Sequence, residues 1–199
     1  MKNLAIGLML SLGLVAGAQA GDAQAGKKIA APCAACHGQD GNSAAASFPK
    51  IAGLGEKYIL KQLKEFKSGA RDNAIMKGQV AALSDTQMAD LAAYFAGNKR
   101  TVGYAKKDQV ALGEKIYRAG NLATGVPACL ACHGADGSGI EAAGFPALGG
   151  QHSDYIKSQL VMFQEDKRNN DASAVMRDIA GRMSNKEVAA VAAYIQGLH

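Results

Sequence analysis

The sequence of 199 residues predicts an all-α protein that consists of two similar domains in tandem. Three observations predict this architecture. One five-residue motif occurs twice, the second half of the chain repeats the first, and apolar residues recur at the spacing of amphipathic helices. No stretch alternates between apolar and polar residues for long enough to predict a strand.

The chain begins with a segment that has the pattern of a secretory signal peptide, which we place at residues 1–20. A basic start is followed by an apolar run at 4–16 and by Ala18-Gln19-Ala20, which fits an A-x-A cleavage site. The apolar run is shorter than the roughly 20 residues that a membrane-spanning helix needs. We therefore expect cleavage before Gly21, and a retained signal anchor is the alternative.

The repeated motif is C-x-x-C-H, and its two copies use all four cysteines of the chain. This is the attachment pattern of a c-type haem, in which two thiols form thioethers with the porphyrin edge and the histidine binds the iron. Disulfides or a structural zinc site would also use paired cysteines, but neither explains a histidine after both pairs. We thus predict two covalently bound haem c groups. The predicted residues are Cys33, Cys36 and His37 in one site and Cys129, Cys132 and His133 in the other.

The two halves of the chain match at equivalent positions. Tyr58 corresponds to Tyr155, for example, and the residues around them keep the same offset. We therefore divide the mature chain into a domain at residues 21–96, a linker at 97–107 and a domain at 108–199. Domains of this size are small for a self-sufficient core, and a buried porphyrin would add apolar area.

Each half is predicted to contain three helices. The first lies near the haem motif, and the second carries apolar residues on one face. The third begins at a serine that is followed three residues later by Gln or Glu, which is the pattern of a capping box. A loop rich in Gly and Ala separates each haem motif from the second helix. The predicted ranges are 23–30, 56–67 and a start at Ser84 in the first half, and 109–119, 154–166 and a start at Ser184 in the second.

The motif histidine leaves one axial position open on each iron, and the repeat indicates which side chain fills it. His152 and His199 have no counterparts in the first half, so we expect both at the surface. Met76 and Met176 occupy matching positions, each in a predicted loop before the last helix. Methionine is often an apolar gap-filler, but this pairing favours an iron ligand, because Met/His ligation is a known haem arrangement.

With this order of haem motif, methionine segment and final helix, each half resembles a class I cytochrome c. The tandem pair, with I-M at 75–76, L-S-D at 83–85 and M-R-D-I-A at 176–180, resembles the di-haem cytochrome c4 family. The resemblance implies two mainly helical domains, each wrapped around one covalent haem and related by pseudo-twofold symmetry. It also implies propionates near the interface and electron transport in the periplasm toward terminal oxidases, with loose peripheral attachment to the inner membrane.

The resemblance further assigns roles to residues that are paired across the repeat. In class I cytochromes a proline carbonyl accepts a hydrogen bond from the iron-bound histidine, and Pro49 and Pro146 match that place. Simple turn prolines are the alternative. Arg71 and Arg168 would neutralise haem propionates, since arginine suits bidentate carboxylate binding, and solvent-facing arginines are the alternative.

These features predict an electron carrier and not an enzyme, because an iron with both axial positions filled does not readily bind oxygen or peroxide. We predict an exported, periplasmic di-haem protein that passes single electrons between redox proteins of the respiratory chain, from a donor to a terminal oxidase. We expect no nucleic-acid partner and no small-molecule substrate. The alternatives are a di-haem enzyme such as a peroxidase, or a fixed electron-transfer subunit of a reductase or oxidase complex.

The charge of the mature chain is uneven. Residues 21–107 carry 13 basic and 7 acidic side chains, a net of +6, whereas residues 108–199 carry 8 and 10, a net of −2. This asymmetry indicates either a basic face for an acidic partner or membrane surface, or an ordinary solvated surface.

Overall fold

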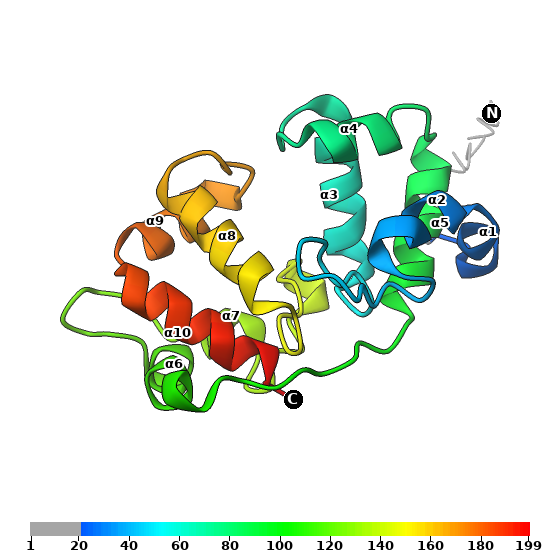
Figure 1. Cartoon of the computed structure of the whole chain (residues 1–199). Coiled ribbons are helices and arrows are strands. Elements are labelled where there is room, and N and C mark those ends of the chain that lie inside the picture. The colour runs from blue at the N-terminus through cyan, green and yellow to red at the C-terminus, as the bar shows by residue number, and fades with distance from the viewer. Residues whose placement is uncertain (1–20) are drawn as a thin grey trace, which may run out of the picture.

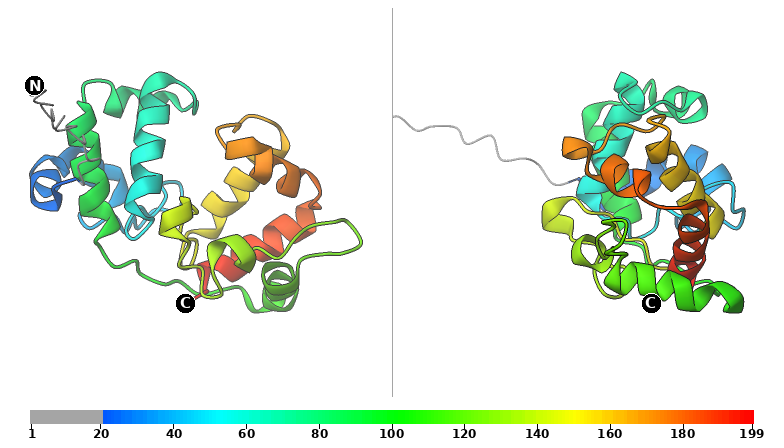
Figure 2. Two further views of the ribbon diagram at one scale, coloured as in Figure 1. Left: turned by 180° about the vertical axis from the view of Figure 1, so that it is seen from behind. Right: turned by 90° about the vertical axis from the view of Figure 1, so that its left-hand side faces the viewer.

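A computed structural model of the chain describes residues 21–199, and these residues form helices joined by loops (Figure 1). Two helical units lie next to each other, and the view from behind in Figure 2 shows the same division. Within the described residues, β structure is limited to isolated bridges, so the all-α prediction is confirmed. The predicted signal peptide falls outside the part of the chain that the structure describes. No helix between residues 21 and 199 combines the length and the apolar character that crossing a membrane would take.

The first unit is built around the contact between its first and last helices. The helix α1 packs against α5, and α3 packs against both α5 and α4. The Asp22 side chain caps α1 by accepting hydrogen bonds from the backbone of Gln24 and Ala25. The helices of this unit are α1 Ala23–Ile29, α2 Ala31–His37, α3 Glu56–Ser68, α4 Ala74–Val80 and α5 Asp85–Ala96.

The second unit repeats this arrangement. Its first long helix, α6, packs against its last, α10, while α8 packs against α10 and α9. The helix α6 begins at Lys107, the last residue of the segment proposed as a linker. The elements are α6 Lys107–Ala119, α7 Leu130–His133, η1 Glu141–Ala143, α8 Ser153–Gln164, η2 Ala172–Ala174, α9 Val175–Gly181 and α10 Asn185–Gln196.

Both predicted capping boxes are confirmed. The Ser84 hydroxyl accepts a hydrogen bond from the Gln87 backbone N–H at 3.1 Å, and the Gln87 side chain accepts from the Ser84 backbone N–H at 2.9 Å. Ser184 and Glu187 make the same pair of contacts at the start of α10. Hydrogen bonds from the Ser184 backbone and from Asn121 hold the pKa of Glu187 below its usual value. These local bonds fix where the last helix of each unit begins.

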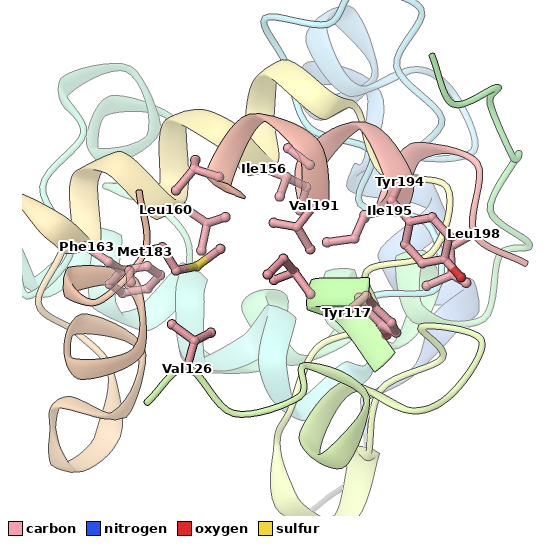
Figure 3. Packing of buried hydrophobic residues seen from close by; sticks show 14 residues of the cluster. Tyr117, Val126, Ile156, Leu160, Phe163, Met183, Val191, Tyr194, Ile195 and Leu198 are labelled. Carbon is pink, nitrogen blue, oxygen red and sulfur yellow. The ribbon is translucent and has the colours of Figure 1, made fainter. Parts of the chain in front are cut away.

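Each unit has its own hydrophobic core, and the two cores differ in size. The core of the first unit is a small cluster around α3 and α5 that includes Ile59, Leu91 and Phe95. The core of the second unit is larger, and Figure 3 shows it packed between α8 and α10. A small core leaves the first unit more dependent on apolar area from a bound cofactor.

The helix pairs α1–α5 and α6–α10 approach so closely that only glycine fits at each contact. A Cβ atom on Gly26 would lie 2.0 Å from the Asp90 carbonyl oxygen. A Cβ atom on Gly113 would lie 2.2 Å from the Ala190 carbonyl oxygen. The same backbone contact therefore sets the helix packing in both halves.

Candidate haem sites

The two C-x-x-C-H motifs lie at helix ends, and each histidine is the last helical residue. The helix α2 contains the first motif entirely, so Cys33 and Cys36 are less than one turn apart. In the second motif, Cys129 is the N-cap residue of α7 and already has helical backbone angles. All four cysteines are half-buried, and they form no disulfide with one another. This arrangement presents two thiols and one imidazole together in each unit.

Each motif histidine is held by the proline that the resemblance to class I cytochromes c assigns to it. The Nδ1 atom of His37 lies 2.8 Å from the Pro49 carbonyl oxygen, and that of His133 lies 2.9 Å from the Pro146 carbonyl oxygen. An imidazole that donates through Nδ1 keeps the Nε2 lone pair available for a metal.

The surroundings of these rings favour the uncharged form. His37 is 8% exposed and His133 is 9% exposed. Burial lowers the pKa of both imidazoles below the usual value, and it outweighs the opposing effect of the hydrogen bond to proline. A neutral imidazole is the form that binds iron.

Met76 and Met176 occupy equivalent places, but those places are helical and not in loops as expected. Met76 lies in the first turn of α4, whose N-cap residue Asn73 accepts a hydrogen bond from the Met76 backbone N–H at 2.9 Å. Met176 lies in the first turn of α9 and packs against the core of the second unit. Both helices have seven residues, too few to show a periodic pattern in the sequence.

Each methionine is less exposed than the residue that precedes it. Ile75 is 63% exposed and Val175 is 44% exposed, whereas Met76 and Met176 are half-buried. Met76 shares a helix face with the buried Val80, four positions later. The two short helices thus place one half-buried methionine each at equivalent positions of the two units.

The residues present fit a covalently attached haem in each unit. A cysteine pair that is not joined by a disulfide and a neutral imidazole with an available Nε2 are the groups that haem c requires. Within residues 21–199, no group of three or more His, Cys, Asp or Glu side chains offers a competing metal site. Burial raises the pKa of the Cys129 thiol to about 11.

The two predicted arginines lie between the units and join them. The guanidinium of Arg71 donates to Gln62 of its own unit at 2.7 Å, and to Tyr155 and Gln159 of the other unit at 3.0 and 2.8 Å. It also lies over the Phe66 ring at 4.6 Å. Arg71 is therefore not the solvent-facing arginine of the alternative prediction.

Arg168 repeats these contacts from the opposite side. It donates to Gln159 of its own unit at 2.7 Å, and to Tyr58 and Gln62 of the other unit at 2.9 and 3.3 Å. It lies over Phe163 at 4.6 Å, and it is only 8% exposed. Arg71 contacts Tyr155 and Gln159 of the second unit, and Arg168 contacts their counterparts in the first. The network therefore has pseudo-twofold symmetry.

The network creates a positive environment between the units. Burial alone would raise the pKa of the Tyr58 hydroxyl, but the nearby charges of Arg168 and Arg71 outweigh it and lower that pKa. The side chains that hold the units together therefore favour negative charge in their surroundings.

The expectation that His152 lies at the surface is wrong. Its ring is half-buried between the units, where Nε2 lies 2.9 Å from the Ser43 hydroxyl and 3.0 Å from the Ser43 carbonyl oxygen. His152 has no counterpart in the first half, so the repeat carried no information about it. His199 is exposed, as predicted.

Comparison with known proteins agrees with this arrangement. The sequence model of the family described as cytochrome c matches residues 23–99 and again residues 110–199. Cytochrome c4 of Pseudomonas aeruginosa is 51% identical over the whole of both chains. The chain belongs to the cytochrome c4 family. It therefore carries two covalent haem c groups and is a di-haem electron-transfer protein.

Two further relatives extend the comparison. The crystal structure of reduced recombinant cytochrome c4 from Pseudomonas stutzeri superposes with a TM-score of 0.88 at 48% identity, covering 90% of this chain and 100% of that one. A protein of Stutzerimonas stutzeri named "Thiosulfate dehydrogenase electron acceptor" is 41% identical, over 81% of this chain and 76% of its own length. The first of these confirms two tandem cytochrome c domains.

Proposed function

We propose that this chain is a periplasmic carrier that passes single electrons between redox proteins of the respiratory chain, with a terminal oxidase as the acceptor. The observation that carries the proposal is the equivalence of the two sites. Each unit presents a cysteine pair, a carbonyl-held histidine and a half-buried methionine at the same place in the fold. Two sites of the same kind suit a protein that accepts and releases electrons at both.

The residues of each site divide the work between attachment and ligation. Cys33 and Cys36, like Cys129 and Cys132, would fix the haem covalently. His37 would bind one face of the first iron, with Pro49 holding the ring in a single orientation. The haem supplies an iron centre that gains or loses one electron.

The methionines would close the opposite faces. Met76 from α4 and Met176 from α9 would each place a thioether sulfur on an iron, which raises its potential relative to bis-histidine ligation. A methionine in that position also denies the iron to water, oxygen and peroxide. His133 and Pro146 would complete the second site in the same way as their counterparts in the first.

The surroundings of the methionines favour brief contacts with other proteins. Ile75 and Val175 are exposed apolar side chains directly beside the proposed ligands, and small apolar contacts of this kind suit transient electron-transfer encounters.

The relative named as an electron acceptor supports a carrier that receives electrons from another protein. The signal pattern at residues 1–20 supports export, and the net positive charge of residues 21–107 supports loose attachment to an acidic surface.

The competing function is catalysis at an open or displaceable iron, and carbon monoxide distinguishes the two. We expect the reduced holoprotein to show no rapid change in its absorption spectrum on exposure to carbon monoxide, because both axial positions are filled. We also expect it to leave the membrane fraction at moderate salt, because screened surface charges would hold it there only loosely. Rapid carbon monoxide binding at either haem would favour an enzyme, and retention in a complex at high salt would favour a fixed subunit.

The interdomain arginines have a proposed role toward the haem carboxylates. Arg71 and Arg168 would neutralise propionates near the interface, which supports a higher potential because negative charge near an iron favours its oxidised form. Arg71→Gln is therefore expected to lower the midpoint potential of one haem in a spectroscopic redox titration. Lys64→Gln is the matched control, because Lys64 lies on α3 with a side chain that is 49% exposed. A titration of Arg71→Gln that coincides with that of the control would contradict the role.

A further inference from the structure

Two more cations lie at the boundary between the units, and neither forms a salt bridge among the described residues. Arg100 and Lys50 both come from the connecting loops of the fold, and neither has a counterpart of like charge in the repeat. Every partner that the structure gives to their charged groups is a neutral backbone carbonyl oxygen. Their positive charge is therefore left without a protein anion.

The guanidinium of Arg100 connects two equivalent loops, one from each unit. Its Nε donates to the Ala52 carbonyl oxygen at 2.8 Å, and its Nη1 donates to the carbonyl oxygens of Ala147 and Gly149 at 3.0 and 3.2 Å. The remaining nitrogen, Nη2, is buried and has no hydrogen-bond partner. A buried N–H donor of a charged group normally has a hydrogen-bond partner. The Nη2 nitrogen of Arg100 is therefore available to an acceptor that the protein itself does not supply.

Lys50 is the second cation of this site, and it is 6% exposed. Its Nζ donates to the Thr101 carbonyl oxygen at 2.6 Å, directly beside Arg100 in the sequence. Its backbone is held by Gln151 of the other unit, which accepts from the Lys50 N–H at 2.9 Å and donates to the Lys50 carbonyl oxygen at 2.7 Å. These bonds fix an ammonium group between the units, where a lysine is rarely found without a counter-charge.

Burial disfavours the charge of both cations, and the charge of Arg100 further disfavours that of Lys50. Burial lowers the pKa of Arg100 to about 10, and the opposing influence comes from the Tyr58 hydroxyl and not from a carboxyl group. Burial lowers the pKa of Lys50 as well, and the charge of Arg100 adds to that effect. An anion placed between them would remove this penalty for both groups.

The place of these cations in the chain identifies the anion. Lys50 directly follows Pro49, whose carbonyl holds His37. Ala147, which accepts from Arg100, directly follows Pro146, whose carbonyl holds His133. The pair therefore lies at the edge of both haem sites, and the only acidic groups that a bound haem adds are its propionate carboxylates.

We propose that Arg100 and Lys50 form a binding site for haem propionate carboxylates at the boundary between the two units. Arginine supplies a planar fork and lysine a point charge, a combination that satisfies several carboxylate lone pairs at once. The site deepens the proposed function, on which it rests, because cations close to both haems raise both midpoint potentials. It shares no hydrogen-bond partner with the Arg71 and Arg168 network, whose guanidinium groups already have side-chain acceptors.

The test is a spectroscopic redox titration of the holoprotein carrying Arg100→Gln or Lys50→Gln. At a fixed potential, the ratio of oxidised to reduced haem is expected to rise about threefold to tenfold in at least one haem. For a one-electron couple this is a fall in midpoint potential of about 28 to 59 mV. Lys99→Gln is the matched control, because Lys99 is the exposed neighbour of Arg100 and loses the same charge to solvent. The fall in midpoint potential caused by Lys99→Gln should be smaller than that caused by Arg100→Gln or Lys50→Gln, and it should decrease further at high salt.

A second readout reports on the carboxylates themselves. Haem labelled with carbon-13 at its propionate carboxyl groups identifies their bands in redox-induced infrared difference spectra. Arg100→Gln is expected to shift a labelled band, whereas Arg100→Lys, which keeps the charge, should retain most of the unmodified potential. Lys50→Gln provides the same comparison if Arg100→Gln fails to incorporate haem.

Two results would overturn the site: potentials of Arg100→Gln and Lys50→Gln equal to that of Lys99→Gln, or labelled carboxylate bands that do not move. Carbon monoxide binding by the unmodified protein would instead overturn the proposed function. Failure of the propionate site and failure of the carrier function can be told apart. The midpoint potentials and the carboxylate bands are properties of the bound haem, and they do not depend on which protein exchanges electrons with it.

Discussion

Replacing Met76 or Met176 with alanine is expected to open one axial position of one haem and to leave the other haem unchanged. The altered haem should lose the far-red absorption band of an iron–methionine bond and should bind carbon monoxide rapidly when reduced. Its midpoint potential should fall by on the order of 0.2 V, within the about 0.8 V that axial ligands span. Spectroscopic redox titration and carbon monoxide binding measure the two effects on the same sample.

A buried methionine that is not a proposed ligand provides the control. Met88 is 1% exposed in the core of α5, and Met88→Leu conserves its volume and apolar character. This variant should keep both far-red bands and both potentials. If Met76→Ala or Met176→Ala also kept them, the sulfur would not bind iron, and the carrier function would lose its main support at that haem.

The parts of the sites that the sequence predicts are those that the chain repeats or builds locally. The C-x-x-C-H motifs, the capping boxes at Ser84 and Ser184 and the pairing of histidine with proline all occur twice at matching positions. Agreement between two copies identifies a position even without related sequences. Met76 and Met176 are paired by the same agreement, and their role as iron ligands stays a prediction. The helices α4 and α9 that carry them are not predicted, because seven residues are too few to show a periodic pattern.

The parts that the sequence does not predict are the contacts between the copies. His152 meets Ser43 across 109 positions of sequence, and Gln151 meets Lys50 across 101. Neither His152 nor Arg100 has a counterpart in the other half, so comparison of the halves gives no signal for either. Such residues are recognised only when the two units are packed together and their polar groups are paired one by one.

Replacing Gly26 with alanine is expected to destabilise the first unit by about 3 kcal/mol, near the upper end of the cost of overpacking a helix contact. The added methyl would lie 2.0 Å from the Asp90 carbonyl oxygen, so α1 and α5 would have to separate along backbone that has no flexible side chain to move. The small core of this unit has little apolar area with which to compensate. Denaturant unfolding followed at the haem absorption bands should show a transition at lower denaturant concentration.

Gly78→Ala is the control that separates steric conflict from glycine replacement in general. Gly78 lies inside α4, and a Cβ atom there would meet nothing within 4 Å, so alanine should stabilise that helix by up to about 1 kcal/mol. Gly113→Ala should reproduce the destabilisation in the second unit, where the added atom would lie 2.2 Å from the Ala190 carbonyl oxygen. Equal stability of Gly26→Ala and Gly78→Ala would mean that α1 and α5 can shift apart freely. The position of α1 on α5 would then not be set by this backbone contact.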